Sequence, residues 1–505
     1  MKSEADRDSS GADVAPAATR FSRRLIGDRV GLIVGVIRIM GADLTVIPHS
    51  VQSANSARWD APGAASWKGR SIGCLCALLM AALLASCGGG EYQIDLMPAP
   101  AVYADGTLSP FPPDFRVDVD EREGILYATL REPADPDGAE GSAYLSPYLD
   151  KRGSVGRVGI GQVELVSGPR EWQEAIGLSL AKDRGADYRL RLVDIDEFGI
   201  LADTVTEFED PDDLPADLGA AGRHFAARVN AELARSTGKD VLVYVHGYKV
   251  PFPDPVLVSA ELWHFLGYHG AVVAFSWPST PSRLAYFSDL DTTDVAAFGF
   301  RRFLEFLARE TDVERIHVLG YSAGTRLVAL TVYQLALLNK ELTPAAARAN
   351  TRLGQVILVG SDMDRHLVGT YLADGILDAV EGFNIYMSKT DKALGVSRFL
   401  LSYERMGEMV EGEIPGAVAD YLLRSENLYL INVTEAEGAA TDNGHGYFRK
   451  SPWASSDILS MIRYGLSPAE RGLVREPGVP IWTFPPDYVE RLQRAIIEKQ
   501  ATAAP

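Results

Sequence analysis

The sequence predicts an α/β fold in which a mostly parallel central sheet carries helices on both faces. The first observation is that strand-length apolar segments alternate with helix-length amphipathic segments between residues 241 and 464. The second is that the strand segments, such as VLVYV at 241–245, are continuously apolar, as in strands buried on both faces. The third is that glycine or polar residues directly follow several of these segments. In parallel sheets this carboxyl edge holds the functional groups.

The individual elements follow from local patterns. Alternating apolar and β-branched residues predict strands at 124–130, 158–166, 188–195, 241–245, 271–275, 316–319, 355–359, 383–387 and 428–433. Helical periodicity and start signals predict helices at 171–181, 218–236, 256–266, 294–309, 323–338, 455–464 and 486–499. The first three strands precede the regular alternation, and we expect them to be leading, partly antiparallel strands of the same sheet.

Composition argues against some classes of function. The 505 residues include 49 Lys and Arg against 68 Asp and Glu, which gives a net charge of -19. This balance argues against a nucleic-acid partner, which would require basic patches. No Cys/His cluster suggests a metal site, and we expect no metal or organic cofactor.

The three cysteines, Cys74, Cys76 and Cys87, lie in one segment with the layout of a secretory signal peptide. Basic residues within 67–70 precede an almost wholly apolar run at 71–84, which is too short for a spanning helix of about 20 residues. The run ends in LASC at 84–87, which resembles a bacterial lipobox. We therefore expect cleavage before Cys87, lipidation of that residue, and anchoring to a bacterial membrane on the periplasmic or cell-surface side. Such a mature chain would have no cysteine left to pair in a disulfide.

These features divide the chain into five parts. Residues 1–66 lie upstream of a signal that should open a chain, and we expect them to be disordered or to come from an over-long start. A lipoprotein signal peptide at 67–86 is followed by a glycine tether and proline-rich extended segment at 87–115. The main domain is expected at 116–470, and a C-terminal tail with a helix at 471–505.

The segment at 314–330 places Ser322 between an apolar strand pattern and a helical pattern. Gly320 and Gly324 lie two residues away on either side. Strand, sharp turn and helix around G-x-S-x-G are the context of a nucleophile elbow, in which the serine backbone is strained and the glycines avoid collisions. With 47 glycines in the chain the pentapeptide alone carries little weight, so the flanking strand and helix are what predict Ser322 as a nucleophile.

A serine hydroxyl needs a base to take its proton and an acid to orient that base. After an elbow of this kind the chain order is serine, acid, histidine. Among the eight histidines, His445 lies in a glycine-flanked loop after the strand expected at 428–433. The others precede Ser322, lie inside expected elements, or come too early after the elbow: His49, His224, His246, His264, His269, His317 and His366. His445 is therefore the expected base.

The acid is expected after one of the strands between Ser322 and His445. Asp391 follows the strand at 383–387 and is preferred, because this is the usual position of the acid. Asp362, after the strand at 355–359, is the alternative, and Asp364 is a weaker third.

Two backbone amides are expected to stabilise an oxyanion. One is the N–H of Ala323, which directly follows the nucleophile, and the other is the N–H of Tyr248, in the loop after the strand at 241–245. His246 and Gly247 open the same loop, and Gly247 lets the backbone approach closely.

Seven segments of the chain resemble a bacterial α/β-hydrolase family of unknown function with esterase- and lipase-like features. They are LMPAPAVY (96–103), ILYATLREP (125–133), VHGYKVPF (245–252), FSWPS (275–279), LGYSAGTR (319–326), YMSKTDKAL (386–394) and GHGY (444–447). The resemblance implies the α/β-hydrolase fold and serine-hydrolase chemistry, with Ser322, Asp391 and His445 as the triad. Lys249 departs from the family, which usually has Asn after H-G-Y, and the resemblance names no substrate.

The expected function is that of a lipid-anchored hydrolase. It would cleave the carboxylic ester of a small molecule or lipid through an acyl-enzyme. The alternatives are another acyl hydrolase, such as a thioesterase, amidase or peptidase, and a catalytically silent binding protein on the same fold.

Overall fold

The computed structural model describes residues 92–111, 124–135, 146–168, 172–181, 188–280, 282, 286–394, 406–407 and 416–503. All of these belong to one compact unit, residues 83–505. The expected start segment (1–66), the signal peptide (67–86) and Cys87 lie outside the described residues. Among the described helices, none is both long enough and apolar enough to cross a membrane.

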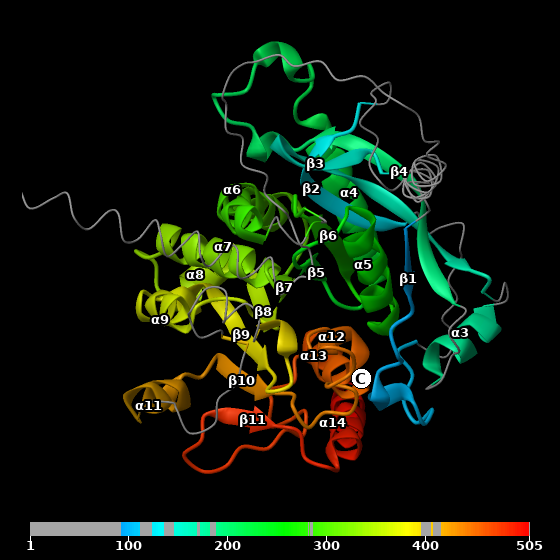
Figure 1. Ribbon diagram of the computed structural model, residues 1–505, viewed down its shortest axis with the longest axis vertical. Helices are drawn as coiled ribbons and strands as arrows, with labels where there is room; N and C mark the ends of the chain where they lie inside the picture. The colour runs from blue at the N-terminus through cyan, green and yellow to red at the C-terminus, as the bar shows by residue number, and fades with distance from the viewer. Residues whose placement is uncertain are drawn as a thin grey trace, which may run out of the picture. The chain divides into compact units, whose positions relative to one another are not determined.

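The described strands form one 11-stranded sheet in the order β1-β4-β3-β2-β6-β5-β7-β8-β9-β10-β11 (Figure 1). Neighbours from β2 to β11 are parallel, whereas β2–β3, β3–β4 and β4–β1 are antiparallel. The expectation of a mostly parallel sheet with leading antiparallel strands is confirmed. The strands are β1 (Gln93–Asp95), β2 (Ile125–Pro133), β3 (Tyr148–Val166), β4 (Arg189–Ile200), β5 (Asp240–Val245), β6 (Ala271–Ser276), β7 (Arg315–Tyr321), β8 (Leu353–Val359), β9 (Val380–Met387), β10 (Leu428–Asn432) and β11 (Ile481–Thr483).

Helices cover both faces of this sheet. Apolar side chains of α4, α6, α7 and α9 form one core with one face, and those of α5, α13 and α14 form a second core with the other. In Figure 1, α6 to α9 lie on one side of the central strands, and α5, α12 and α13 lie on the other. The helices are α3 (Trp172–Leu180), α4 (Ala220–Arg235), α5 (Pro253–Phe265), α6 (Tyr286–Glu310), α7 (Gly324–Leu338), α8 (Pro344–Thr351), α9 (Arg365–Ala373), α11 (Gly416–Arg424), α12 (Tyr447–Lys450), α13 (Pro452–Tyr464) and α14 (Tyr488–Ala503).

Side-chain alternation along β5 explains how one strand serves both layers. Val241, Val243 and Val245 belong to the first core, and Leu242 and Tyr244 belong to the second. All five side chains are almost fully buried, and each of the four aliphatic ones contributes about 1.5–3 kcal/mol by leaving water. A strand with no solvated face must be apolar throughout, which is why its sequence is a continuous apolar run.

The proline-rich segment, expected to be an extended segment after the tether, is partly buried. Its strand β1 pairs antiparallel with β4. Val102 is 1% exposed, and its N–H donates to Ser456 Oγ over 3.1 Å. The segment has no periodicity of its own, so its burial follows from the apolar surface that α13 offers it.

The C-terminal part, expected as a tail beyond residue 470, is integral to the sheet and its second core. β11 pairs parallel with β10, and α14 buries Tyr488, Leu492 and Ile496 completely. The helix itself was expected, but the strand was not, because three residues carry no readable alternation. The domain therefore does not end at residue 470.

Candidate active site

Ser322 lies in the turn between β7 and α7. Its φ of 53° falls in the left-handed region that residues with a side chain rarely adopt. A Cβ atom added to Gly320 would lie 2.9 Å from Val328 Cγ2, and one added to Gly324 would lie 2.3 Å from the carbonyl oxygen of His246. Both glycines are therefore sterically required beside the serine, as a nucleophile elbow demands.

Three side chains that are far apart in the chain form a hydrogen-bonded row. His445 Nε2 lies 2.8 Å from Ser322 Oγ, and His445 Nδ1 lies 2.7 Å from Asp391 Oδ2. Asp391 and His445 are buried, whereas Ser322 is half-buried. In this arrangement Nδ1 can donate to the carboxylate while Nε2 accepts from the hydroxyl, as a base must. The structure thus brings the expected nucleophile, base and preferred acid together.

The Asp391 carboxylate is held by backbone amides. Its Oδ1 atom accepts hydrogen bonds from the N–H groups of Ala393 and Leu394, each over 3.1 Å. Asp362 is also buried, beyond the end of β8, but the carboxylate bonded to His445 Nδ1 is that of Asp391. The third candidate, Asp364, caps α9 by accepting from the N–H of His366.

The His445 ring is held in place by its own loop and by β8. Gly444 has a φ of +70°, and a Cβ atom there would lie 2.3 Å from the carbonyl oxygen of Thr390. Gly360, at φ +57°, passes close to the ring, where a Cβ atom would lie 3.0 Å from His445 Cε1. The Tyr447 hydroxyl accepts from the N–H of Gly360 over 2.7 Å. Loop and strand end therefore fix the imidazole together.

The loop after β5 borders Ser322, as expected. A Cβ atom added to Gly247 would lie 2.9 Å from Ser322 Cβ, which brings the following residue, Tyr248, beside the elbow. Ala323 is buried and directly precedes α7. Backbone N–H groups and the helix dipole favour negative charge at this end of a helix. The two expected oxyanion donors, Tyr248 and Ala323, therefore lie on backbone segments that flank Ser322.

His246 joins two loops at the carboxyl edge of the sheet. Its Nδ1 atom lies 2.8 Å from the carbonyl oxygen of Gly247, and its Nε2 atom lies 3.0 Å from that of Trp277. In return, Trp277 Nε1 donates to the carbonyl oxygen of His246 over 2.7 Å. Burial, together with the charge of Arg131, lowers the pKa of His246 to about 3. The ring is therefore neutral at physiological pH, so only one of its two nitrogens donates to a carbonyl oxygen at a time.

Two other histidines lie at the opposite, amino edge of the sheet. His317 Nδ1 accepts from the N–H of Gln355 over 2.9 Å, and His269 Nε2 lies 3.5 Å from Asp240. Their distance from the carboxyl edge agrees with their exclusion as the base on sequence grounds.

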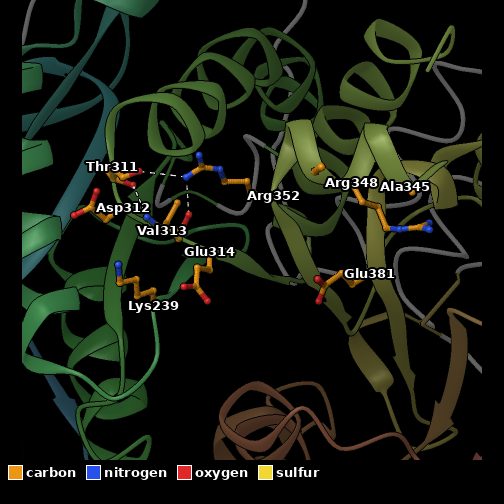
Figure 2. A pocket seen from close by; sticks show the side chains of 10 residues that line it. Lys239, Thr311, Asp312, Val313, Glu314, Ala345, Arg348, Arg352 and Glu381 are labelled. Carbon is orange, nitrogen blue, oxygen red and sulfur yellow. Dashed lines mark hydrogen bonds between the residues drawn. The ribbon is translucent and has the colours of Figure 1, made fainter. Parts of the chain in front are cut away.

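A surface cavity of about 690 Å³ also opens at the amino edge (Figure 2). Its walls come from the residues that precede β5, β7 and β8 and from the start of β9. Arg352 Nη1 donates to the carbonyl oxygens of Thr311 and Val313 at this wall. Three basic residues, Lys239, Arg348 and Arg352, line the cavity together with the acidic residues Asp312, Glu314 and Glu381. Because Ser322 follows the carboxyl end of β7, this cavity is not its substrate site.

Sequence reasoning missed several residues that hold the site. Gly360 lies beside the ring of the proposed base, and Tyr447 bonds Gly360. Trp277 bonds His246 in the oxyanion loop, defined as residues 246–250. Trp277 lies in a quoted family segment, but nothing in its local pattern indicated its partner. Within the described parts of the chain, no group of three or more His, Cys, Asp or Glu side chains could hold a metal ion.

One family model agrees with this fold. A family model described as "Alpha/beta hydrolase of unknown function (DUF900)" matches residues 222–461. A solved structure, described as "a C4-C4 SN3 tributyrin phosphonate inhibited by esterase B from Lactobacillus rhamnosis", aligns at 14% identity and a TM-score of 0.26. The alignment covers 50% of this chain and 94% of that one. No curated protein matches the sequence. The sheet, the elbow and the family model together show an α/β-hydrolase fold.

Proposed function

We propose that the protein is a serine hydrolase that cleaves carboxylic esters through an acyl-enzyme intermediate. The observation that carries the proposal is the row of hydrogen bonds from Ser322 Oγ through His445 to Asp391, over 2.8 and 2.7 Å. The strained serine backbone, at φ 53°, adds support because strain of this kind concentrates at functional residues.

Acylation would use each of these groups in a defined way. As Ser322 Oγ bonds to the ester carbonyl carbon, its proton passes to His445 Nε2, and the carbonyl electron pair moves onto the oxygen. Asp391 stabilises the imidazolium by accepting from Nδ1–H. The N–H groups of Tyr248 and Ala323 hold the oxyanion. When the tetrahedral intermediate collapses, the bond to the alkoxy oxygen breaks and His445 gives its proton to the leaving alcohol.

Deacylation repeats the sequence with water as the nucleophile. His445 takes a proton from the water as its oxygen bonds to the acyl carbon, and later returns it to Ser322 Oγ. The products are a carboxylic acid and an alcohol, and the balance requires no other reactant.

A fluorophosphonate probe tests the proposal directly. We expect covalent labelling of the wild-type protein at Ser322 and no labelling of Ser322→Ala, with both proteins folded by circular dichroism. Failure of the folded wild type to react would favour a catalytically silent binding protein. Turnover of p-nitrophenyl esters of increasing chain length would then define the acyl preference. Faster turnover of matched thioester or amide substrates would instead assign another acyl hydrolase.

We also propose that the protein is exported and anchored through a lipid on Cys87. The support is the sequence pattern at 67–87. The Tyr92 hydroxyl donates to Asp254 Oδ2 on α5 over 2.7 Å, so the chain is fixed to the domain soon after the tether. Expression in a bacterium with an alkyne-tagged fatty acid should label the wild type and leave Cys87→Ala unlabelled. Equal labelling of both proteins, or of neither, would refute the anchor.

A further inference from the structure

A fully buried arginine lies behind the oxyanion loop (residues 246–250). Arg131, on β2, is 0% exposed. Its Nη2 atom donates to the carbonyl oxygen of Val250 over 2.7 Å, and its Nη1 atom donates to that of Ser279 over 3.2 Å. Its Nε atom donates to Ser276 Oγ over 3.0 Å, at the end of β6. The guanidinium thus bonds both loops that meet at the carboxyl edge.

Ser279 also bonds Val250, through its side-chain hydroxyl. Its hydroxyl donates to the carbonyl oxygen of Val250 over 2.9 Å and accepts from the N–H of Val250 over 3.1 Å. Both polar groups of Val250 are therefore bonded. Lys249, directly before it, has a φ of 65°, so the loop contains a strained residue between Tyr248 and this fixed point.

The charge of Arg131 is compensated by Asp150, whose Oδ1 atom lies 2.7 Å from Nη1. Burial lowers the pKa of Arg131 to about 10, so the guanidinium stays charged at physiological pH. A buried ion pair contributes little net stability compared with well-packed apolar side chains. An apolar side chain, however, could not donate to the carbonyl oxygens of Val250 and Ser279. The specific effect of Arg131 is therefore to hold the two loops in a fixed geometry.

We propose that Arg131 is a positioning residue for the oxyanion hole. By holding the carbonyl oxygens of Val250 and Ser279, it fixes the loop that presents the N–H of Tyr248 to the carbonyl oxygen of the substrate. This inference rests on the proposed serine-hydrolase function. Lysine cannot replace arginine here, because one ammonium group lacks the planar fork that reaches several acceptors at once.

The test compares Arg131→Lys with a matched control, Arg471→Lys. Arg471 is also fully buried and donates to Asp457 and to the carbonyl oxygen of Leu466, but it lies in the C-terminal part of the chain. The readouts are the pre-steady-state acylation rate per titrated active site with a p-nitrophenyl ester, the KM, and the unfolding temperature.

We expect Arg131→Lys to lower the acylation rate about 10- to 100-fold, a fraction of the effect of losing an oxyanion donor outright, with little change in KM. Arg471→Lys should lower the unfolding temperature while the acylation rate per active site stays within about twofold of wild type. Equal acylation rates in the two variants, in a wild type that does acylate, would overturn the role of Arg131 and leave the proposed function standing. A folded wild type that does not acylate would overturn both.

Ser279→Ala keeps the inference testable if Arg131→Lys does not fold. It removes only the two hydroxyl bonds to Val250 and leaves the Arg131 side chain in place. A slower acylation rate with an unchanged KM would support the positioning of this loop, whereas a rate equal to that of wild type would refute it.

Discussion

Gly247 passes so close to Ser322 that a Cβ atom added to the glycine would lie 2.9 Å from Cβ of the serine. This separation is shorter than ordinary side-chain contacts allow, and neither atom is the end of a flexible side chain. The same added atom would lie 3.2 Å from the carbonyl oxygen of Tyr321. The backbone of the loop at 246–250 therefore packs directly against the turn that carries Ser322, and the approach leaves no room for a side chain at position 247.

Gly247→Ala should move the oxyanion loop away from Ser322 and lower the acylation rate on the order of 100-fold, because a displaced donor no longer faces the oxyanion. Gly369→Ala is the matched control. Gly369 is exposed on α9, and an added Cβ atom meets nothing within 4 Å. That change should raise the free energy of unfolding by about 0.5–1 kcal/mol and leave acylation unchanged. A fully active Gly247→Ala protein would contradict the close fit.

Asp391→Asn should lower kcat by a factor on the order of 10⁴, because the amide favours the wrong tautomer of His445. The asparagine retains an oxygen that can accept from the N–H groups of Ala393 and Leu394, so the protein should fold. Asp362→Asn serves as the comparison, and steady-state turnover of one ester measures both. If Asp362→Asn loses activity while Asp391→Asn keeps it, the assignment of the acid is wrong.

Burial of neutral His246 should make stability fall as the pH falls. The unfolded chain takes up a proton at this residue below its ordinary pKa of about 6.5, whereas the folded protein resists protonation until about pH 3. Between these values the unfolded state binds more protons, so stability is fully present above about pH 6.5 and declines below it.

Denaturant unfolding at about pH 7.5 and about pH 5 measures this effect. From the higher to the lower pH, the wild type should lose about 2 kcal/mol more than His246→Gln, since all other groups titrate in both proteins. Parallel pH profiles for the two proteins would show that His246 does not contribute in this way.

Lys249→Asn should stabilise the protein. Lys249 is exposed with a φ of 65°, and asparagine adopts this left-handed conformation more readily than lysine. We expect the free energy of unfolding to rise by about 0.5–1 kcal/mol, with unchanged labelling by a fluorophosphonate. Lys249→Ala controls for loss of the charge, because alanine gains nothing at this φ. A gain shared equally by both variants would point to charge rather than backbone strain.

Much of the fold follows from local patterns in the sequence. The apolar run that became β5 and the glycines around Ser322 are local signals, because burial on two faces and a tight turn restrict the residues at those positions directly. The position of His445 could be inferred from chain order. Its role as a base, like those of Ser322 and Asp391, stays a prediction until activity is measured.

Other features depend on residues that are distant in the sequence. Asp391 and Asp362 follow neighbouring strands with similar local sequence contexts, and only the packed structure brings one carboxylate to 2.7 Å from His445 Nδ1. Arg131 lies on β2, over a hundred residues before the loops it holds. Nothing beside it in the sequence specifies those partners.

The sequence by itself determined the alternation of elements, the elbow and the short set of candidates for base and acid. Each of these features depends on residues that are close together in the sequence. Periodic apolar side chains indicate the helices and strands, and the backbone φ that a tight turn requires restricts the residues around Ser322. Only the tertiary structure decided which carboxylate meets His445, that β11 and α14 complete the sheet and its second core, and that Arg131 bonds the carbonyl oxygens of Val250 and Ser279. Those outcomes depend on hydrogen bonds and burial between distant segments, which form only when the sheet brings its strand ends together.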